Sequence, residues 1–414
     1  MKKRYALEYH NTKKILRWKP VFYISMFFFY WFFQLSLNNS LLPYYIAKYS
    51  ISSQGLFASL PLIGNLLLFV PAGIIVDRYD IAKIVKTSIM VIVSSIIVVE
   101  LTTLKSIAYA SFLVIGFAGS FSMLSCIRIA NDCFTPKNVG LPISISITIA
   151  FLGSYFGNII SGFLLDIFQN TFPVNLSNIL LGLFINIFCI RNITTNKKKI
   201  SSKAASLDVY HTILNVLKKE QNWIVSFYIA LMNIPVMILG FSFGQSYLNN
   251  VFSVSAKKAS LIASAISLGC LIGGPIWNKL ACYIQEKYES RRTLMFVLTT
   301  AYFFLTLSLF ISSNKSSGFL TTVFFHIGFL GSVQTLCYPI IASNNDPRSI
   351  ASTTSLTSII IMSSSVLLQI LFGKLETSYS YHSAYGLIPL CVLFSFILIF
   401  FISDQPSKKT KYLT

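Results

Sequence analysis

The sequence predicts an all-α membrane protein whose twelve transmembrane helices form two pseudo-symmetric six-helix bundles. Composition is the first reason: 54% of the 414 residues are hydrophobic and only 11% are charged, whereas a soluble domain carries roughly 25% charged residues. The second reason is that the apolar residues come in blocks of about 20, the length that crosses a ~30 Å hydrocarbon core as a helix. The third is that short motifs of the first half return, in the same order, in the second half.

The apolar blocks follow one another along the whole chain. Twelve can be counted, centred near residues 33, 66, 94, 119, 152, 182, 236, 270, 302, 331, 360 and 393. The strands of a membrane barrel would instead alternate polar and apolar residues over about 10 positions, and these blocks do not. We therefore expect each block to form one helix.

The basic residues orient the predicted helices. The net charge is +20, and 33 residues are Lys or Arg. With the N-terminus inside, 26 of them fall on inside segments, 6 on outside loops and one, Arg128, within a span. This positive-inside distribution predicts a bacterial inner-membrane protein with both termini in the cytoplasm. It also explains the basic composition without a nucleic-acid partner.

Two matched motifs indicate an internal repeat. The segment Ile115–Ser120 returns as Ile327–Ser332, and Gly73-x-x-x-Asp77-Arg78 returns as Gly274-x-x-x-Asn278-Lys279. Two parallel six-helix repeats form two bundles around a central cavity. We predict a first bundle at residues 1–190, a cytoplasmic linker at 191–221 and a second bundle at 222–414.

One loop carries a resemblance to a known family. The run from Gly73 through Asp77, Arg78 and Asp80 to Lys83 resembles the signature G-x-x-x-D-[RK]-x-G-[RK]-[RK], which major facilitator proteins carry between helices two and three. The resemblance implies the major facilitator fold and transport by alternating access. We interpret the glycine as allowing close approach of a neighbouring helix, and the charged pair as an ionic latch. The predicted cytoplasmic gate consists of Gly73, Asp77, Arg78, Asp132, Asn278 and Lys279.

The chain departs from the signature at two points. Asp80 stands where the family prefers glycine, and Asn278 stands where the repeat would carry a second aspartate. Because an amide has no charge, we expect the latch of the second half to be weaker.

A narrower resemblance covers most of the chain. It rests on Gln221-Asn222-Trp223, Ile272-Gly273-Gly274-Pro275, Arg291-Arg292, and Gln369 with Gly373. Together these residues resemble the phagosomal-transporter branch of intracellular bacteria, whose members import amino acids or nucleosides. The resemblance implies import of such a solute with protons. The chain differs from this branch in its seventh helix, where Gly240-Phe-Ser-Phe-Gly244 has no acidic residue.

Ionisable residues inside a span are costly and therefore point to function. Arg128, on the fourth helix, either binds a substrate carboxylate, pairs with Asp132 or Asp77, or extends to the interface as arginines at helix ends do. Glu100 and His326 are the candidates for proton coupling. Nine residues at 1.5 Å separate His326 from the predicted outer end of its helix at Ser317, which places it about 14 Å deep. The alternatives are a peripheral carboxylate for Glu100 and a hydrogen-bonded buried imidazole for His326.

Uncharged polar residues supply the substrate-binding candidates. In the family that the loop resembles, helices one, four, seven and ten line the cavity. Polar groups in hydrocarbon alternatively serve as partners between helices. The candidates are Tyr30, Gln34, Asn38, Arg128, Asn158, Asn233, Gln334, Tyr338 and Gln369. Asn158 belongs to a run, Gly153-x-x-x-Gly157, that resembles an antiporter motif without its proline, and close helix packing is the interpretation we prefer for it.

We predict a secondary active transporter that imports a small polar metabolite, such as an amino acid, with proton coupling. A drug or metabolite efflux antiporter is the first alternative, and a non-transporting membrane sensor is an alternative of another class. The chain shows no phosphate-binding loop, HExxH or nucleophile elbow, so we predict no enzymatic activity and no cofactor. The seven cysteines show no CxxC pairing, so neither a disulfide nor a metal site is expected. The predicted partners are a small-molecule substrate, protons and the lipid bilayer, and the protein is expected to be monomeric.

Overall fold

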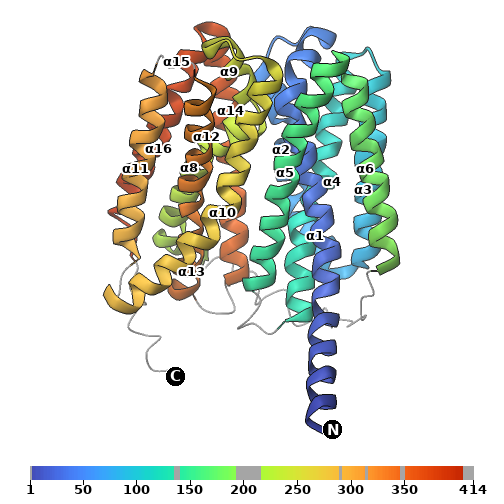
Figure 1. The fold of residues 1–414 in the computed structure, drawn as a ribbon, viewed down its shortest axis with the longest axis vertical. Coiled ribbons are helices and arrows are strands. Elements are labelled where there is room, and N and C mark those ends of the chain that lie inside the picture. The colour runs from blue at the N-terminus through green and yellow to red at the C-terminus, as the bar shows by residue number, and fades with distance from the viewer. Residues whose placement is uncertain are drawn as a thin grey trace. The chain divides into compact units, whose positions relative to one another are not determined.

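The protein is helical wherever the structure, a computed structural model, describes regular elements. It describes residues 2–134, 140–192, 216–288, 291–312, 316–345 and 350–403, so most of the predicted linker lies outside the described residues. The helices of the first half are α1 (Lys2–Tyr49), α2 (Gln54–Arg78), α3 (Ile81–Leu101), α4 (Lys105–Cys133), α5 (Gly140–Phe168) and α6 (Thr171–Asn192). Those of the second half are α8 (Glu220–Phe241), α9 (Gly244–Phe252), α10 (Ala256–Tyr288), α11 (Arg292–Ile311), α12 (Ser317–Gly331), the 3₁₀ helix η1 (Ser332–Leu336), α13 (Cys337–Asn344), α14 (Ile350–Ser378), α15 (Tyr381–Tyr385) and α16 (Leu387–Ile399) (Figure 1).

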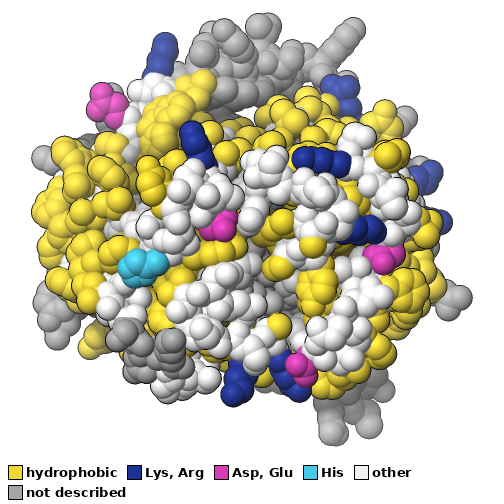
Figure 2. Space-filling view, turned by 90° about the horizontal axis from the view of Figure 1, so that it is seen from above, with side chains coloured by type: hydrophobic (Ala, Val, Ile, Leu, Met, Phe, Trp, Pro, Cys, Tyr) yellow, Lys and Arg dark blue, Asp and Glu magenta, His cyan; other side chains and the backbone are white. Residues whose placement is uncertain are grey.

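The lengths of these helices confirm the prediction of a multi-pass membrane protein. Eleven helical segments of the described chain are long and apolar enough to cross a bilayer, and the apolar part of α6, Thr171–Ile187, is shorter. Each predicted block lies in one of these twelve segments. Large apolar side chains face outward on them, with Leu67 62% exposed and Phe184 66% exposed. In the view of one end of the molecule, charged side chains are few and are separated by hydrophobic and uncharged ones (Figure 2). The outward-facing apolar side chains along the helices, such as Leu67 and Phe184, are suited to lipid rather than water.

The chain divides into two compact units. Unit 1 comprises Met1–Ser52 and Leu60–Lys198, and unit 2 comprises Ser53–Ser59 and Lys199–Thr414. Unit 2 thus includes the first turns of α2, which lie outside the range predicted for the second bundle, residues 222–414. The reason is a close approach inside unit 2: a side chain added at Gly373 of α14 would lie 2.5 Å from the Cα atom of Gly55.

Polar pairs fix the packing of α1 on α5 inside unit 1. The hydroxyl groups of Ser25 and Ser146 lie 2.7 Å apart, and those of Ser40 and Ser161 lie 2.5 Å apart. Both pairs are 121 residues apart in sequence, and a constant offset is the mark of two helices that run parallel. Because hydroxyl and amide groups in a membrane interior bond across helices, these pairs set the register of α1 against α5.

Glycines of the sequence repeat occupy matching close crossings in the two units. A side chain added at Gly116 of α4 would collide with the carbonyl oxygen of Pro61 on α2 and lie 2.9 Å from the Cα atom of Gly64. A side chain added at Gly328 of α12 would collide with the carbonyl oxygen of Ile266 on α10. The shared sequence around these two glycines therefore reflects one packing solution used twice, in which only glycine allows the backbones to meet.

The transition from α8 to α9 is the point at which the chain lacks the acidic residue of the resembled branch. The helix ends at Phe241, and the backbone N–H groups of Ser242 and Phe243 both bond to the carbonyl oxygen of Ile238. A side chain on Gly244 would collide with the carbonyl oxygen of Leu239. Glycine at this position therefore permits the tight turn that starts α9.

Candidate functional site

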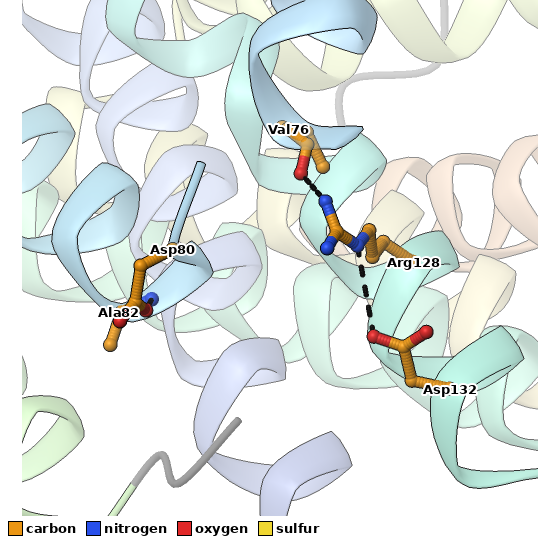
Figure 3. A network of polar contacts seen from close by, with 5 residues as sticks. All are labelled: Val76, Asp80, Ala82, Arg128 and Asp132. Atoms are coloured by element: carbon orange, nitrogen blue, oxygen red, sulfur yellow. Dashed lines mark hydrogen bonds and ion pairs between the residues drawn. The ribbon is translucent and has the colours of Figure 1, made fainter. Parts of the chain in front are cut away.

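Arg128 closes the end of α2 against α4. Its guanidinium donates a hydrogen bond to the carbonyl oxygen of Val76, in the last turn of α2, and its Nε lies 3.7 Å from the Oδ2 atom of Asp132 (Figure 3). The last carbonyls of a helix lack partners within it and carry its negative dipole end, which favours a cation there. Asp77 lies near enough to interact electrostatically with both charged groups. Arg128 thus lies among the carboxylates of Asp132 and Asp77, and its role in a gate stays a prediction.

Asp80 has a structural role of its own. It is the N-cap of α3, and its carboxylate accepts a hydrogen bond of 2.9 Å from the backbone N–H of Ala82 (Figure 3). Aspartate is among the residues preferred at this position. Asp80, which stands where the family prefers glycine, therefore caps the start of α3.

The equivalent place in unit 2 is joined by uncharged groups. The side-chain amide of Asn278 on α10 donates to the carbonyl oxygen of Gly274, at 2.9 Å, and to the hydroxyl of Thr335 in η1, at 2.8 Å. Lys279 and Arg78 are exposed. Asn278 thus makes two hydrogen bonds at the position that Asp77 occupies in the first copy of the motif, and the weaker latch stays a prediction.

The role predicted for the glycine of the loop is wrong within the described structure. Side chains added at Gly73 or at Gly274 would have no described atom within 4 Å. Close helix approach in these bundles occurs instead at Gly116 and Gly328. The motif glycines lie further along α2 and α10 than these crossings: Gly73 is nine residues after Gly64, and Gly274 is eight residues after Ile266.

Two of the substrate candidates on α1 lie against α6. Gln34 is buried and accepts a hydrogen bond from the side-chain amide of Asn178. Tyr30, one turn earlier, is fully buried, and a side chain added at Gly182 of α6 would lie 2.5 Å from its hydroxyl oxygen. Gln34 therefore bonds across helices within unit 1, whereas the hydroxyl of Tyr30 packs on α6 without a hydrogen-bond partner.

Asn158 also lies between helices. Its side-chain oxygen accepts from Asn39 on α1 at 3.4 Å, and its amide donates to the carbonyl of Ser154 at 3.1 Å. The neighbouring glycines of α5 pack on α1 as well: side chains at Gly153 and Gly157 would collide with its atoms. The contacts agree with our preferred interpretation of this motif, which is helix packing.

Four other candidates keep polar atoms available. Asn233 on α8 accepts a hydrogen bond of 3.0 Å from Gln334 in η1, and each amide uses only one of its two polar atoms in this contact. Asn38 of unit 1 and Tyr338 of unit 2 have no hydrogen-bond partner among the described residues. These are the groups of the predicted set that can take a polar ligand without breaking a bond between helices.

Gln369 differs from all of these. It is fully buried on α14, and neither its amide oxygen nor its amide nitrogen has a hydrogen-bond partner. Buried polar atoms are nearly always paired in folded proteins, so the two unpartnered amide atoms of Gln369 are an unusual feature of α14.

The two residues predicted for proton coupling, Glu100 and His326, both make hydrogen bonds in the structure. Glu100 accepts hydrogen bonds from the side chains of Asn175, at 2.6 Å, and Thr171, at 3.4 Å. The Nδ1 atom of His326 lies 2.7 Å from the carbonyl oxygen of Thr322, one turn earlier on α12. Since a carbonyl oxygen only accepts, Nδ1 is the donor in this contact. Their part in coupling stays a prediction.

Several polar residues of the bundles were missed in the sequence. Asn175 and Asn178 of α6 pair with α1 and α3, and Asn222 of α8 donates to Asn345 at 3.3 Å. These residues could have been noted from the sequence, because an asparagine inside an apolar block needs a hydrogen-bond partner on another helix. Which helix supplies that partner depends on how each helix is rotated, and this is not written in the sequence.

The model of a family described as the Major Facilitator Superfamily matches residues 22–245 and 225–413. No curated protein gives a significant match. A bacterial homologue of the human lysosomal transporter Spinster, inward-facing and unoccupied, is similar in structure at 14% identity with a TM-score of 0.73, covering 95% of this chain and 99% of that one. A D-xylose-proton symporter is similar at 10% identity with a TM-score of 0.73, covering 94% and 98%. At these identities the likeness concerns the fold.

Proposed function

Since the chain belongs to the Major Facilitator Superfamily, we propose that it imports a small polar metabolite across a bacterial inner membrane, with protons, by alternating access. The observation that carries the proposal is the family match in both halves of the chain. The paired glycine crossings at Gly116 and Gly328 support it from the structure, because two bundles built alike are what a rocking mechanism requires.

The substrate class rests on uncharged polar groups. Asn38, Asn233, Gln334 and Tyr338 offer donors and acceptors but no charge, which suits the polar parts of an amino acid or a similar metabolite. The resemblance to the phagosomal branch through Gln221-Asn222-Trp223 supports the same class. The structural neighbour named as a D-xylose-proton symporter supports proton coupling on the same fold.

The gate proposal rests on Arg128. Its bond to Val76 ties the end of α2 to α4, and its neighbours Asp132 and Asp77 balance its charge. An exposed ion pair is worth about 0–1 kcal/mol. A latch of this strength can open and close in each transport cycle when water reaches it.

Uptake of a radiolabelled panel of amino acids and nucleosides tests the function. Cells that express the chain should accumulate at least one compound above cells that carry an empty vector, and a protonophore should abolish the accumulation. Asn233→Leu should reduce uptake, whereas Asn178→Leu, on the α1–α6 contact, should lower protein yield without changing the apparent KM. The absence of uptake for every compound, with the protein present in the membrane, would refute the proposed substrate class.

A further inference from the structure

Besides the two proton-coupling candidates, Glu100 and His326, a third titratable residue lies where three helices of unit 2 meet. Glu376 is two residues from the end of α14, Tyr381 begins α15, and Ser246 is in the first turn of α9. The side chain of Glu376 interacts with that of Tyr381, which also interacts with Ser246. The turn at Gly244 places α9 so that Ser246 reaches this point.

The second oxygen of this carboxyl is buried and alone. Glu376 Oε2 has no hydrogen-bond partner, and in the described part of the chain no cation forms an ion pair with it. A buried charge without a partner is costly. The other titratable and charged groups near the same end of α14 and on the elements packed there are Lys374 on α14, Tyr379 after it, His382 and Tyr385 on α15, and Tyr247 on α9. Lys374 and His382 are exposed, and His382 stacks on Phe310.

Unpartnered amides continue the polar cluster along α14. Gln369 lies two turns before Glu376, and a seven-residue spacing places both on one face of the helix. Between them Gly373 admits the backbone of Gln54 and Gly55, and the amide oxygen of Gln54 is also buried without a partner. The unpartnered atoms are thus three acceptors, namely Glu376 Oε2 and the amide oxygens of Gln54 and Gln369, and one donor, the Gln369 nitrogen.

A proton would supply the missing donor. An ionised carboxylate only accepts hydrogen bonds, whereas a protonated one also donates. We propose that Glu376, whose Oε2 is buried without a partner where α14, α15 and α9 meet, is a proton-binding site of this transporter, with Tyr381 as its neighbour. The proton comes from water, adds to Oε2 and returns to water on release. That this proton drives transport rests on the proposed function, whereas its binding does not.

Infrared difference spectroscopy of the purified protein, titrated with acid in the absence of substrate, tests the site. The C=O stretch of a protonated carboxyl should grow on acidification, and Glu376→Gln should remove one component of that band. Glu100→Gln is the matched control, because Glu100 has two hydrogen-bond partners and lies in unit 1. It should leave the component assigned to Glu376 unchanged. A full-amplitude band in Glu376→Gln would overturn the proposal.

Two further variants keep the test decisive if Glu376→Gln does not fold. Tyr381→Phe should shift the midpoint of the same component, because the hydroxyl that interacts with the carboxyl is gone, and Glu376→Asp should shift it by moving the carboxyl. An unchanged midpoint in both would also overturn the proposal. Uptake separates the two claims. If no panel compound is transported by the wild type while the band titrates as expected, the proposed function fails and the proton site stands. If proton-driven uptake is lost in Glu376→Gln while exchange persists, both the proposed function and the proton-binding site at Glu376 stand.

Discussion

Replacing Gly116 by alanine places a methyl group directly against backbone. It would meet the carbonyl oxygen of Pro61 and lie 2.9 Å from both the nitrogen of Asn65 and the Cα atom of Gly64. Because these are backbone atoms, no side chain can rotate away, and overpacking typically costs about 1–3 kcal/mol. Alanine regains about 1 kcal/mol as the better helix former. From the upper end of that range, we expect Gly116→Ala to destabilise unit 1 by roughly 2 kcal/mol.

The loop motif offers a matched control. A methyl at Gly73 meets nothing within 4 Å, so Gly73→Ala should show only the gain in helix propensity, at most about 1 kcal/mol. The two variants should thus differ by about 3 kcal/mol, which corresponds to roughly 6–12 °C in unfolding temperature for a unit of this size. Gly328→Ala and Gly274→Ala form the same comparison in unit 2.

A thiol-reactive dye can report this unfolding. Cys126 of unit 1 and Cys270 of unit 2 are buried and free, so the dye becomes fluorescent as each unit opens. The purified variants are heated side by side in the same detergent. Equal unfolding temperatures for Gly116→Ala and Gly73→Ala would refute the argument that the crossing requires glycine.

Three other outcomes are expected. Asp80→Ala should cost about 1 kcal/mol of stability through loss of the N-cap, and Asp80→Asn should retain it; equal loss in both would contradict the capping role. The double-mutant cycle of Ser40→Ala with Ser161→Ala should give a coupling of about 0.6 kcal/mol in thermal unfolding, and strictly additive effects would mean that the contact contributes nothing. Arg128→Lys should lower stability by about 1 kcal/mol with an unchanged uptake KM; a strongly raised KM would assign the arginine to the substrate.

The positions of the helices followed from the sequence because local composition decides them. A block of about 20 apolar residues becomes a span whatever its neighbours are, and α12 begins at Ser317, where the predicted tenth span enters the membrane. The sequence did not predict which side of each helix faces the bundle. In a membrane protein the lipid side and the bundle side are both apolar, so polarity identifies the inner side only weakly. Gln34 therefore could not be assigned in advance to Asn178 rather than to a cavity.

The candidate site shows the same division. The Asp80 cap could have been predicted, since an aspartate directly before an apolar helical run is a start signal. The bond from Arg128 to Val76 could not, because backbone carbonyls leave no mark in the sequence. Glu376 was overlooked for a related reason. Its distinguishing feature is its surroundings, which Tyr381 and Ser246 bring from separate helices.

The polar pairs of α1 and α5 have a consequence for biosynthesis. Ser40 is made 121 residues before Ser161, and Asn39 is made 119 residues before Asn158. At about 5–20 residues per second, a ribosome takes roughly 6–24 s to reach these partners. During that interval the polar face of α1 has entered the membrane without α5. We expect the insertion machinery to hold α1 beside the translocation channel until α5 emerges, so that shortening the chain before residue 158 should leave α1 crosslinked to the channel.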